Sequence, residues 1–471
     1  MLCWVDVSWA FRPGLFPFLD EINNPTIFLD ASYHGIVHLF PARVYNDRPV
    51  GWALVRLMAD LFGYDYRRQV ACLLAIHFAN CGLAFLLFRR LSTSVPIAIS
   101  GVALFGSLWT TAATATYAGA PFDVFCLFFL LGSTLALLSE RRGSTVFSAL
   151  LFLAALRSKE LAIFAPLLFT VLLAFRTPRM PLRLKLAALS RRLWIHYLIA
   201  VVIGLRYLSL YPAYRARLIR QPNPYAMDFH ITTVLQSLIY YASLAFGAES
   251  GRWQIPPMVF ALALGAILGW AALRRRAGIA FGVCAFAFTL QPVSLMPQQR
   301  MTLYAYVPQV FLILVLCLLV EEIIASASKR ERVRWLAAVC VALVCVWWCV
   351  AFRRSPYFKD RVNWTIGVRR ASMRTAQTAV QLPPMRPETH VYVAHNPGTM
   401  PWLFVAGPCG YFQEVNAQRD IFCIIDRPSD QLRALYANDS GPKYLLDYQD
   451  DGRIAVVQSA GPGVLANTTS E

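Results

Sequence analysis

The sequence has little charge for its length. Charged residues make up 15% of the 471 residues, whereas hydrophobic residues make up 57% and the mean hydropathy is +0.49. A soluble domain has about 25% charged residues. Polar residues are therefore too few to cover a water-exposed surface, which excludes a soluble enzyme, a disordered chain and a fibrous protein. The composition predicts a polytopic membrane protein.

Acidic residues are also scarce, since 26 Asp and Glu stand against 44 Lys and Arg and the net charge is +18. Such an excess is typical of nucleic-acid binding or of basic cytoplasmic loops. The high hydropathy favours the loops and argues against a nucleic-acid partner. Lysine itself is rare, so that Lys159, which lies among apolar segments, stands out.

No two cysteines have the CxxC spacing, which argues against a zinc ribbon or a thioredoxin motif. Most of the cysteines lie in apolar runs, where cysteine behaves as a small hydrophobic residue. Cys409 and Cys423 lie instead in the polar C-terminal region. They would pair if this region faced an oxidising compartment.

Apolar runs predict about ten transmembrane helices, because the hydrocarbon core to be crossed is about 30 Å thick. The runs are 69–88, 95–113, 121–139, 145–156, 160–175, 193–211, 256–273, 278–297, 302–320 and 334–352. The run 231–249 carries several Thr, Ser and Tyr residues. We interpret it as an interfacial segment on the outer face rather than an eleventh span.

Basic residues follow every odd-numbered span, as in Arg89–Arg90, Arg141–Arg142 and Arg274–Arg276. These loops are therefore predicted to be cytoplasmic, which places both 1–65 and 353–471 outside. Charges and prolines interrupt residues 1–18. We therefore expect either an upstream helix beyond this sequence or partial insertion of 1–18.

The composition changes near Arg386. Short β-like runs at 390–394 and 421–425, a helical run at 427–436 and a hairpin at 443–457 predict a small extramembrane α/β domain. The expected fold is thus an all-α polytopic membrane protein with this domain appended. Its predicted parts are an outer-face loop with an amphipathic helix at 1–65, a transmembrane domain at 66–352 and the α/β domain at 353–471.

Adjacent carboxylates at Asp20 and Glu21 give the clearest chemical signal in the first outer loop. Mutual repulsion tends to raise one pKa of such a pair, so that one group can act as a base. The alternative is that both are solvated loop acids. The two carboxylates could also bind a divalent metal ion.

Arg48 precedes an amphipathic run that begins at Pro49, a residue suited to a first helical turn. Arg48 would lie at the outer interface, either pairing with a phosphate or with Asp20, or simply anchoring the helix. His77 and Asn80 lie one turn apart within the first span. They serve either a functional role or interhelical hydrogen bonds.

Arg157-Ser158-Lys159-Glu160 interrupts two short apolar runs and predicts a break that dips into an outer cavity. There Lys159 and Glu160 would form an ion pair or bind an anion. Arg300 and Tyr304 lie in another outer turn, where Arg300 suits a lipid phosphate. Ordinary interfacial anchoring is the alternative for Arg300.

The order of these features resembles the GT-C fold membrane glycosyltransferases, in particular the branch containing protein O-mannosyltransferases. The resemblance covers most of residues 15–365. It rests on Asp20-Glu21, Tyr45 to Val50, Phe62-Gly63-Tyr64, His77 with Asn80 leading to Phe88 to Leu91, Ser158-Lys159-Glu160 with Pro166, Asn223-Pro224, and Arg300 with Tyr304. Three features depart from the family. The sequence does not show the family's first transmembrane helix, and the acidic pair is Asp-Glu where two aspartates are also common. The chain has no TPR array.

The resemblance implies inverting transfer of a sugar from a polyprenyl-phosphate carrier to an acceptor on the outer face. In that reaction Asp20 would be the general base, with Glu21 beside it. Arg300 and Lys159 would hold the phosphate, and Arg48 would touch it or hold the loop. Glu160, Tyr304 and His77 would complete the binding site, and 231–249 would line the acceptor or lipid path.

The expected partners are the lipid-linked donor, membrane lipids and an acceptor that is a protein, a lipid or a polysaccharide. The expected location is the inner membrane, with the C-terminal domain outside. A transporter or flippase of a polyprenyl-linked glycan is the alternative function, although such proteins usually have paired broken helices. A non-catalytic assembly subunit is a third.

Overall fold

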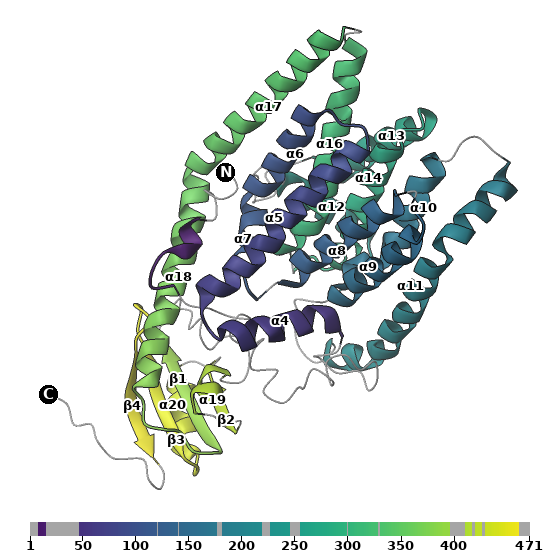
Figure 1. The fold of residues 1–471 in the computed structure, drawn as a ribbon. Helices are drawn as coiled ribbons and strands as arrows, with labels where there is room; N and C mark the ends of the chain where they lie inside the picture. Colours follow the sequence, from purple (N-terminus) through teal and green to yellow (C-terminus); the bar gives the residue numbers. More distant parts are fainter. Residues whose placement is uncertain are drawn as a thin grey trace.

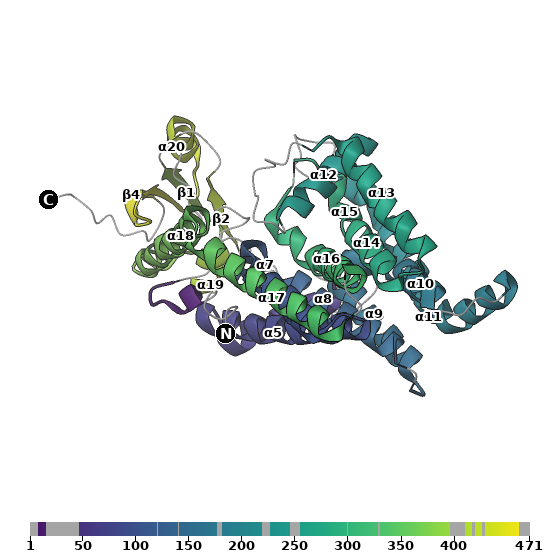
Figure 2. The ribbon, with the colours of Figure 1, turned by 90° about the horizontal axis from the view of Figure 1, so that it is seen from above.

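The computed structural model describes residues 8–15, 47–119, 121–139, 141–176, 181–218, 227–244, 255–298, 300–327, 330–395, 410–416, 420–425 and 429–460. Within these residues a bundle of helices stands beside a small α/β domain (Figure 1). Seen from above, this domain lies next to α18 (Pro356–Val380) and on the opposite side of the molecule from α10 (Ala165–Arg176) and α11 (Leu182–Leu218) (Figure 2).

The bundle consists of apolar helices joined by turns. They are α5 (Tyr66–Arg90), α6 (Val95–Ser107), α7 (Trp109–Ala115), α8 (Pro121–Leu137), α9 (Ser144–Ser158), α10 (Ala165–Arg176), α11 (Leu182–Leu218), α12 (Ile231–Leu244), α13 (Pro257–Leu273), α14 (Ala277–Thr289), α15 (Gln291–Ser294), α16 (Tyr306–Ala327) and α17 (Glu331–Arg354). Among the described residues, short 3-10 turns are formed by η1 (Ser8–Phe11), η3 (Glu160–Phe164) and η4 (Thr302–Ala305).

The helices coincide with the predicted apolar runs, but ten full spans are not confirmed. Among the described residues, four helical segments are long and apolar enough to cross a membrane: 66–90, 183–209, 302–327 and 331–354. The pair α6 and α7 would add a fifth if its 63° bend lies within one span. The other apolar helices are shorter. Among them α12 has 14 residues and is roughly 21 Å long, so its predicted interfacial position stays a prediction.

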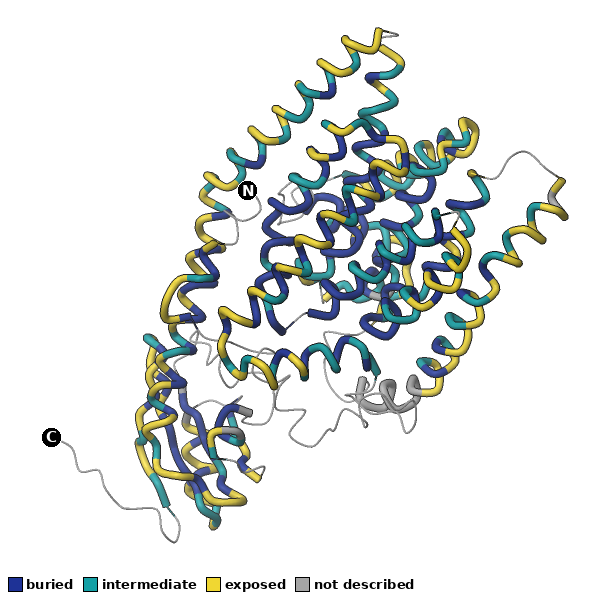
Figure 3. Tube along the Cα trace, viewed as in Figure 1, coloured by how far each residue is buried: buried dark blue, intermediate teal, exposed yellow. Residues whose placement is uncertain are grey.

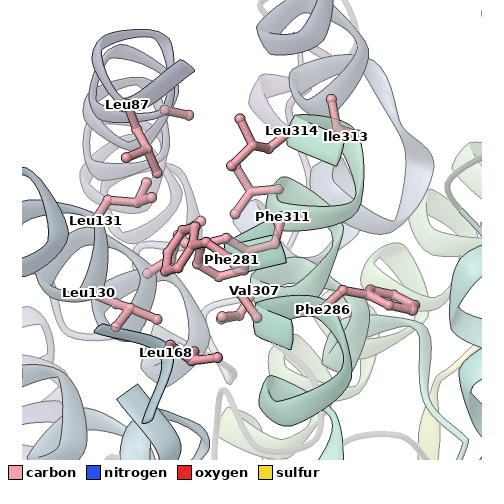
Figure 4. Close-up of a cluster of buried hydrophobic side chains, with 14 of the residues drawn as sticks. Leu87, Leu130, Leu131, Leu168, Phe281, Phe286, Val307, Phe311, Ile313 and Leu314 are labelled. Carbon is pink, nitrogen blue, oxygen red and sulfur yellow. The ribbon is translucent and has the colours of Figure 1, made fainter. Parts of the chain in front are cut away.

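The core of the bundle lies where α5, α8, α10, α14 and α16 meet (Figure 4). Phe281 and Phe311 pack edge to face there, with ring centroids 5.7 Å apart. The outer helices are more exposed (Figure 3). Only 11% of the most apolar stretch of α17 is buried, and only 17% of that of α11. Exposed apolar side chains on these helices, such as Trp347 on α17 and Leu205 on α11, suit contact with lipid.

Helix α4 (Pro49–Phe62) crosses one end of the bundle, close to the α/β domain (Figure 1). This confirms the predicted helix that begins at Pro49. Gly51 lets α4 approach α8 and the end of α9 closely, because a Cβ atom there would lie 2.4 Å from the Phe122 ring and 3.1 Å from the carbonyl oxygen of Ser158. We call this end of the bundle the α4 end and the opposite end the far end.

Helix α18 (Pro356–Val380) follows α17 and leads into the α/β domain. The side chain of Ser355 caps it by accepting a hydrogen bond from the backbone N–H of Phe358 at 3.3 Å. The sequence did not predict this helix. It is rich in charged residues, and its apolar residues form a narrow stripe rather than a continuous run.

The α/β domain contains β1 (Thr389–His395), α19 (Gly410–Val415), β2 (Ile421–Ile424), α20 (Ser429–Asn438), β3 (Lys443–Tyr448) and β4 (Ile454–Ala460). The strand order is β2-β1-β3-β4, with β1 parallel to both neighbours and β4 antiparallel to β3. The predicted strands, hairpin and helix are confirmed.

Alternating side chains give the sheet two buried faces. Val391, Val393 and Leu446 pack with Ala376 and neighbouring residues of α18. Tyr392, Ala394 and Leu445 pack instead with Leu432 and Tyr436 of α20. Cys423 of β2 is disulfide-bonded. Its predicted partner, Cys409, lies outside the described residues.

Candidate active site

The chain preceding α4 is joined to the break after α9 by an ion pair. Nε and Nη2 of Arg48 donate to the two carboxylate oxygens of Glu160 at 2.8 and 2.9 Å. Asp47 fixes the approach to α4 by accepting from the backbone N–H of Arg48 at 2.7 Å and from Nε1 of Trp52 at 2.8 Å. The guanidinium carbon of Arg48 lies 5.4 Å from the Phe122 ring centroid. Arg48 is therefore held on two sides.

A second ion pair lies deeper, between Lys159 and Asp123. Their side chains are 5% and 0% exposed, so the pair is almost removed from solvent. The ammonium of Lys159 also lies 4.9 Å from the ring centroid of Tyr304. The other carboxylate oxygen of Asp123, Oδ1, is buried and has no hydrogen-bond partner among the described residues.

The two pairs form one ionic cluster: Arg48, Asp123, Lys159 and Glu160. The backbone at Lys159 is extended, with φ −157° and ψ 141°, between α9 and η3. Successive side chains of an extended segment point in opposite directions, so Lys159 and Glu160 have different partners. The suggested Lys159–Glu160 ion pair is therefore wrong, and Arg48 pairs with Glu160 within the described residues.

Arg300 and Tyr304 lie beside this cluster, on the segment that leads into α16. The hydroxyl of Tyr240 donates to the carbonyl oxygen of Arg300 at 3.4 Å, and Tyr241 interacts electrostatically with Tyr304, Arg300 and Asp123. Nε of Arg300 and the hydroxyl of Tyr241 are buried and have no hydrogen-bond partner in the part of the chain that the structure describes. Buried donors of this kind usually meet a water or a ligand.

His77 and Asn80 lie inside the bundle and bind Tyr306 rather than a member of the ionic cluster. Nδ1 of His77 is 2.8 Å from the hydroxyl of Tyr306, and Nδ2 of Asn80 donates to the same hydroxyl at 3.1 Å. Asn80 also donates to the carbonyl oxygen of Val124 at 2.9 Å. Both side chains are wholly buried. These contacts join α5 to α16 and α8. They are the interhelical hydrogen bonds expected as one of the two roles of His77 and Asn80.

Asp20 and Glu21 lie outside the described residues, so their predicted role as base and possible metal site stays a prediction. Within the described ranges no group of three or more His, Cys, Asp or Glu side chains could hold a metal ion.

Asp123 is the residue that sequence reasoning missed. It lies in the first turn of α8, and the signal was a lone carboxylate at the start of an apolar run. Ionisable residues within membrane segments are costly and usually face a partner or a cavity. That rule identifies Asp123 as a candidate, but only the fold identifies Lys159 as its partner.

No protein-family model and no curated protein matches this sequence. The structure is similar to the solved structure of ArnT from Cupriavidus metallidurans in the apo state, with a TM-score of 0.53 and 12% identity over 95% of this chain and 91% of that chain. ArnT from the same organism bound to undecaprenyl phosphate gives a TM-score of 0.46 and 14% identity over the same shares. The apo comparison shows that the fold is similar to that of ArnT. The O-mannosyltransferase branch is not confirmed.

Proposed function

We propose that this chain is a membrane glycosyltransferase that moves a sugar from a polyprenyl-phosphate carrier to an acceptor at the α4 end of the bundle. The fold and the apolar helices support a membrane protein of this class. The disulfide at Cys423 supports an oxidising compartment around the α/β domain, since disulfides persist mainly outside the cytosol.

The observation that supports the proposal is the position of Lys159, Arg48 and Arg300 at one end of the bundle, where Tyr304 lies against Lys159 and Tyr241 interacts with both Asp123 and Arg300. A polyprenyl phosphate that leaves the sugar gains negative charge, and fixed cations stabilise such charge best when they are already in place. Asp123 and Tyr304 contact the ammonium of Lys159, while the carboxylate of Glu160 accepts from Nε and Nη2 of Arg48. The site is thus organised before any donor binds.

The three cations differ in their freedom to meet a phosphate. Lys159 and Arg48 are each matched by a carboxylate, whereas Nε of Arg300 has no hydrogen-bond partner among the described residues. We therefore assign the most direct phosphate contact to Arg300. Lys159 supplies charge at the same end of the bundle, and Asp123 is a positioning residue that fixes Lys159.

The chemistry requires a base for the acceptor hydroxyl, and the sequence resemblance assigns this role to Asp20. The acceptor oxygen forms a bond to the anomeric carbon as the bond from that carbon to the phosphate oxygen breaks. The hydroxyl proton passes to Asp20, and the phosphate leaves with the bonding electrons. Attack opposite the leaving phosphate inverts the anomeric centre.

The test is transfer from a purified polyprenyl-phosphate sugar by the full chain in liposomes. General-base catalysis contributes typically about 10²–10⁴-fold, so Asp20→Asn should lower turnover by that factor while donor binding persists. The matched control is Asp60→Asn, which removes an exposed carboxylate that pairs with Arg56 on α4. Near wild-type turnover of Asp20→Asn would remove Asp20 from the mechanism. Lipid-linked sugar crossing the bilayer without transfer would favour a flippase.

A further inference from the structure

A cavity of about 270 Å³ opens at the far end of the bundle, away from the ionic cluster. Four arginines from three separate parts of the chain line it: Arg90 at the end of α5, Arg176 at the end of α10, and Arg275 and Arg276 between α13 and α14. Glu321 and Glu322 of α16 line it as well. We call this cavity the arginine pocket.

The two glutamates do not neutralise the arginine pocket. Glu322 accepts a hydrogen bond from Nη2 of Arg276 at 2.6 Å, and Glu321 accepts from the backbone N–H of Ser94 at 2.9 Å. Arg90 donates to the carbonyl oxygen of Leu138 at 3.0 Å, which leaves its charge uncompensated. Arg176 forms no ion pair among the described residues. The pocket therefore has an excess of positive charge.

Unusual backbone conformations shape the same pocket. Among the described residues, Ser92, Arg275 and Glu388 are the non-glycine residues with positive φ, and the first two line the arginine pocket. The φ of Ser92 is 80° and that of Arg275 is 56°, a region that side chains disfavour. Such conformations often mark functional sites. Here they indicate that the α5–α6 and α13–α14 turns are shaped for more than the connection of helices.

An apolar groove runs into the arginine pocket. This second cavity has a volume of about 660 Å³ and lies between α13 and α16, lined by Ile267, Trp270, Leu319 and Ile323 among others. It shares Arg276 and Glu322 with the arginine pocket. Ala271 is the one buried residue of α13, so this helix presents its apolar surface outwards.

We propose that the two cavities together bind an anionic phospholipid, with its phosphate in the arginine pocket and an acyl chain in the groove between α13 and α16. Charge complementarity selects the headgroup, because basic pockets between transmembrane helices bind anionic headgroups. Continuity with the groove selects a lipid over a free anion, which would leave the apolar surface uncovered. This site is independent of the glycosyltransferase proposal and lies at the other end of the bundle.

The test is native mass spectrometry of the full chain in detergent, titrated with phosphatidylglycerol or with phosphatidylcholine. The variant is Arg176→Gln with Arg275→Gly, because glycine adopts the φ of residue 275 without strain. The matched control is Arg332→Gln with Arg334→Gln, which removes the same charge from the start of α17, outside both cavities. Thermal unfolding in the same detergent, with and without inorganic phosphate, checks folding and the free anion.

We expect wild type and control to bind phosphatidylglycerol in preference to phosphatidylcholine. A surface arginine contributes an interaction worth about a fivefold change in affinity, so the Arg176/Arg275 variant should bind roughly 25-fold more weakly while unfolding no earlier than wild type. Equal weakening in the control would show a diffuse charge effect and overturn the proposal. Equal binding of phosphatidylcholine, or stabilisation by inorganic phosphate as large as that by the lipid, would also overturn it.

Discussion

The two ends of the bundle handle positive charge in opposite ways. At the α4 end, Lys159 and Arg48 are each bound to a carboxylate from a distant part of the chain. At the far end, four arginines share a pocket with two glutamates, and one of these glutamates binds a backbone N–H instead. The difference follows burial, because a charge withdrawn from water is costly unless it is paired. The buried cation pairs of the α4 end are therefore formed within the chain, with Arg300 left for a phosphate, whereas at the far end four arginines exceed the charge of two glutamates.

The largest expected effect tests the deeper pair. Lys159→Met leaves the fully buried carboxylate of Asp123 without its cation, and breaking a buried pair in this way costs about 3–5 kcal/mol. Thermal unfolding in detergent should show a marked loss of stability. The double change Lys159→Met with Asp123→Leu should recover most of it, because neither charge then remains. Lys359→Met, on the exposed surface of α18, is the control and should have little effect. A single variant as stable as wild type would contradict the buried pairing.

A second prediction concerns the seating of α4 over the ionic cluster. Gly51→Ala places a Cβ atom 2.4 Å from the ring of Phe122, and overpacking of this kind typically costs about 1–3 kcal/mol. Gly82→Ala on α5 is the matched control, because nothing lies within 4 Å of the added Cβ and alanine is the better helix former. Unfolding midpoints should therefore move in opposite directions. A neutral Gly51→Ala would show that α4 sits farther from α8.

Glu160→Gln tests the more exposed of the two ion pairs at the α4 end. It removes the carboxylate that accepts from Nε and Nη2 of Arg48. The side chains of Arg48 and Glu160 are 28% and 31% exposed, so water can replace part of the interaction. We expect a cost of about 1 kcal/mol, below that of Lys159→Met. A double-mutant cycle with Arg48→Gln should give a coupling free energy above about 0.5 kcal/mol. Additive effects would mean that the two residues do not interact in solution.

The smallest effect is expected at the far end. Arg176→Gln removes a charge that has no ion-pair partner among the described residues. Surface changes away from special features usually stay within about 0.5 kcal/mol, so the unfolding midpoint in lipid-free detergent should not move measurably. A large loss of stability would show that Arg176 has a structural partner, and the contrast between the two ends would fail.

Local patterns were sufficient to predict much of the fold. Apolar runs located the bundle helices, Pro49 located the start of α4, and the polar residues 157–160 located the break before η3. Alternation of apolar residues located the strands. Each of these features depends on residues close together in sequence, which is why a single sequence reveals them.

Long-range features were not predictable in this way. The partner of Lys159 is 36 positions away and that of Arg48 is 112 positions away, and nothing local specifies either pairing. Helix α18 was missed because its apolar stripe becomes a buried face only when the sheet packs against it. The ten spans predicted from hydropathy are not confirmed, since hydropathy does not show where a run bends or ends within the bundle.

The central claim is that the cations at the α4 end serve a lipid-linked phosphate rather than stability alone. The direct measurement is sugar transfer from polyprenyl phosphate in liposomes by an Arg300→Gln variant, once its unfolding midpoint is shown to approach that of wild type. Loss of a charge-assisted contact of about 1.5–3 kcal/mol predicts turnover roughly 10- to 150-fold below that of wild type. Turnover within twofold of wild type in this folded variant would contradict the claim.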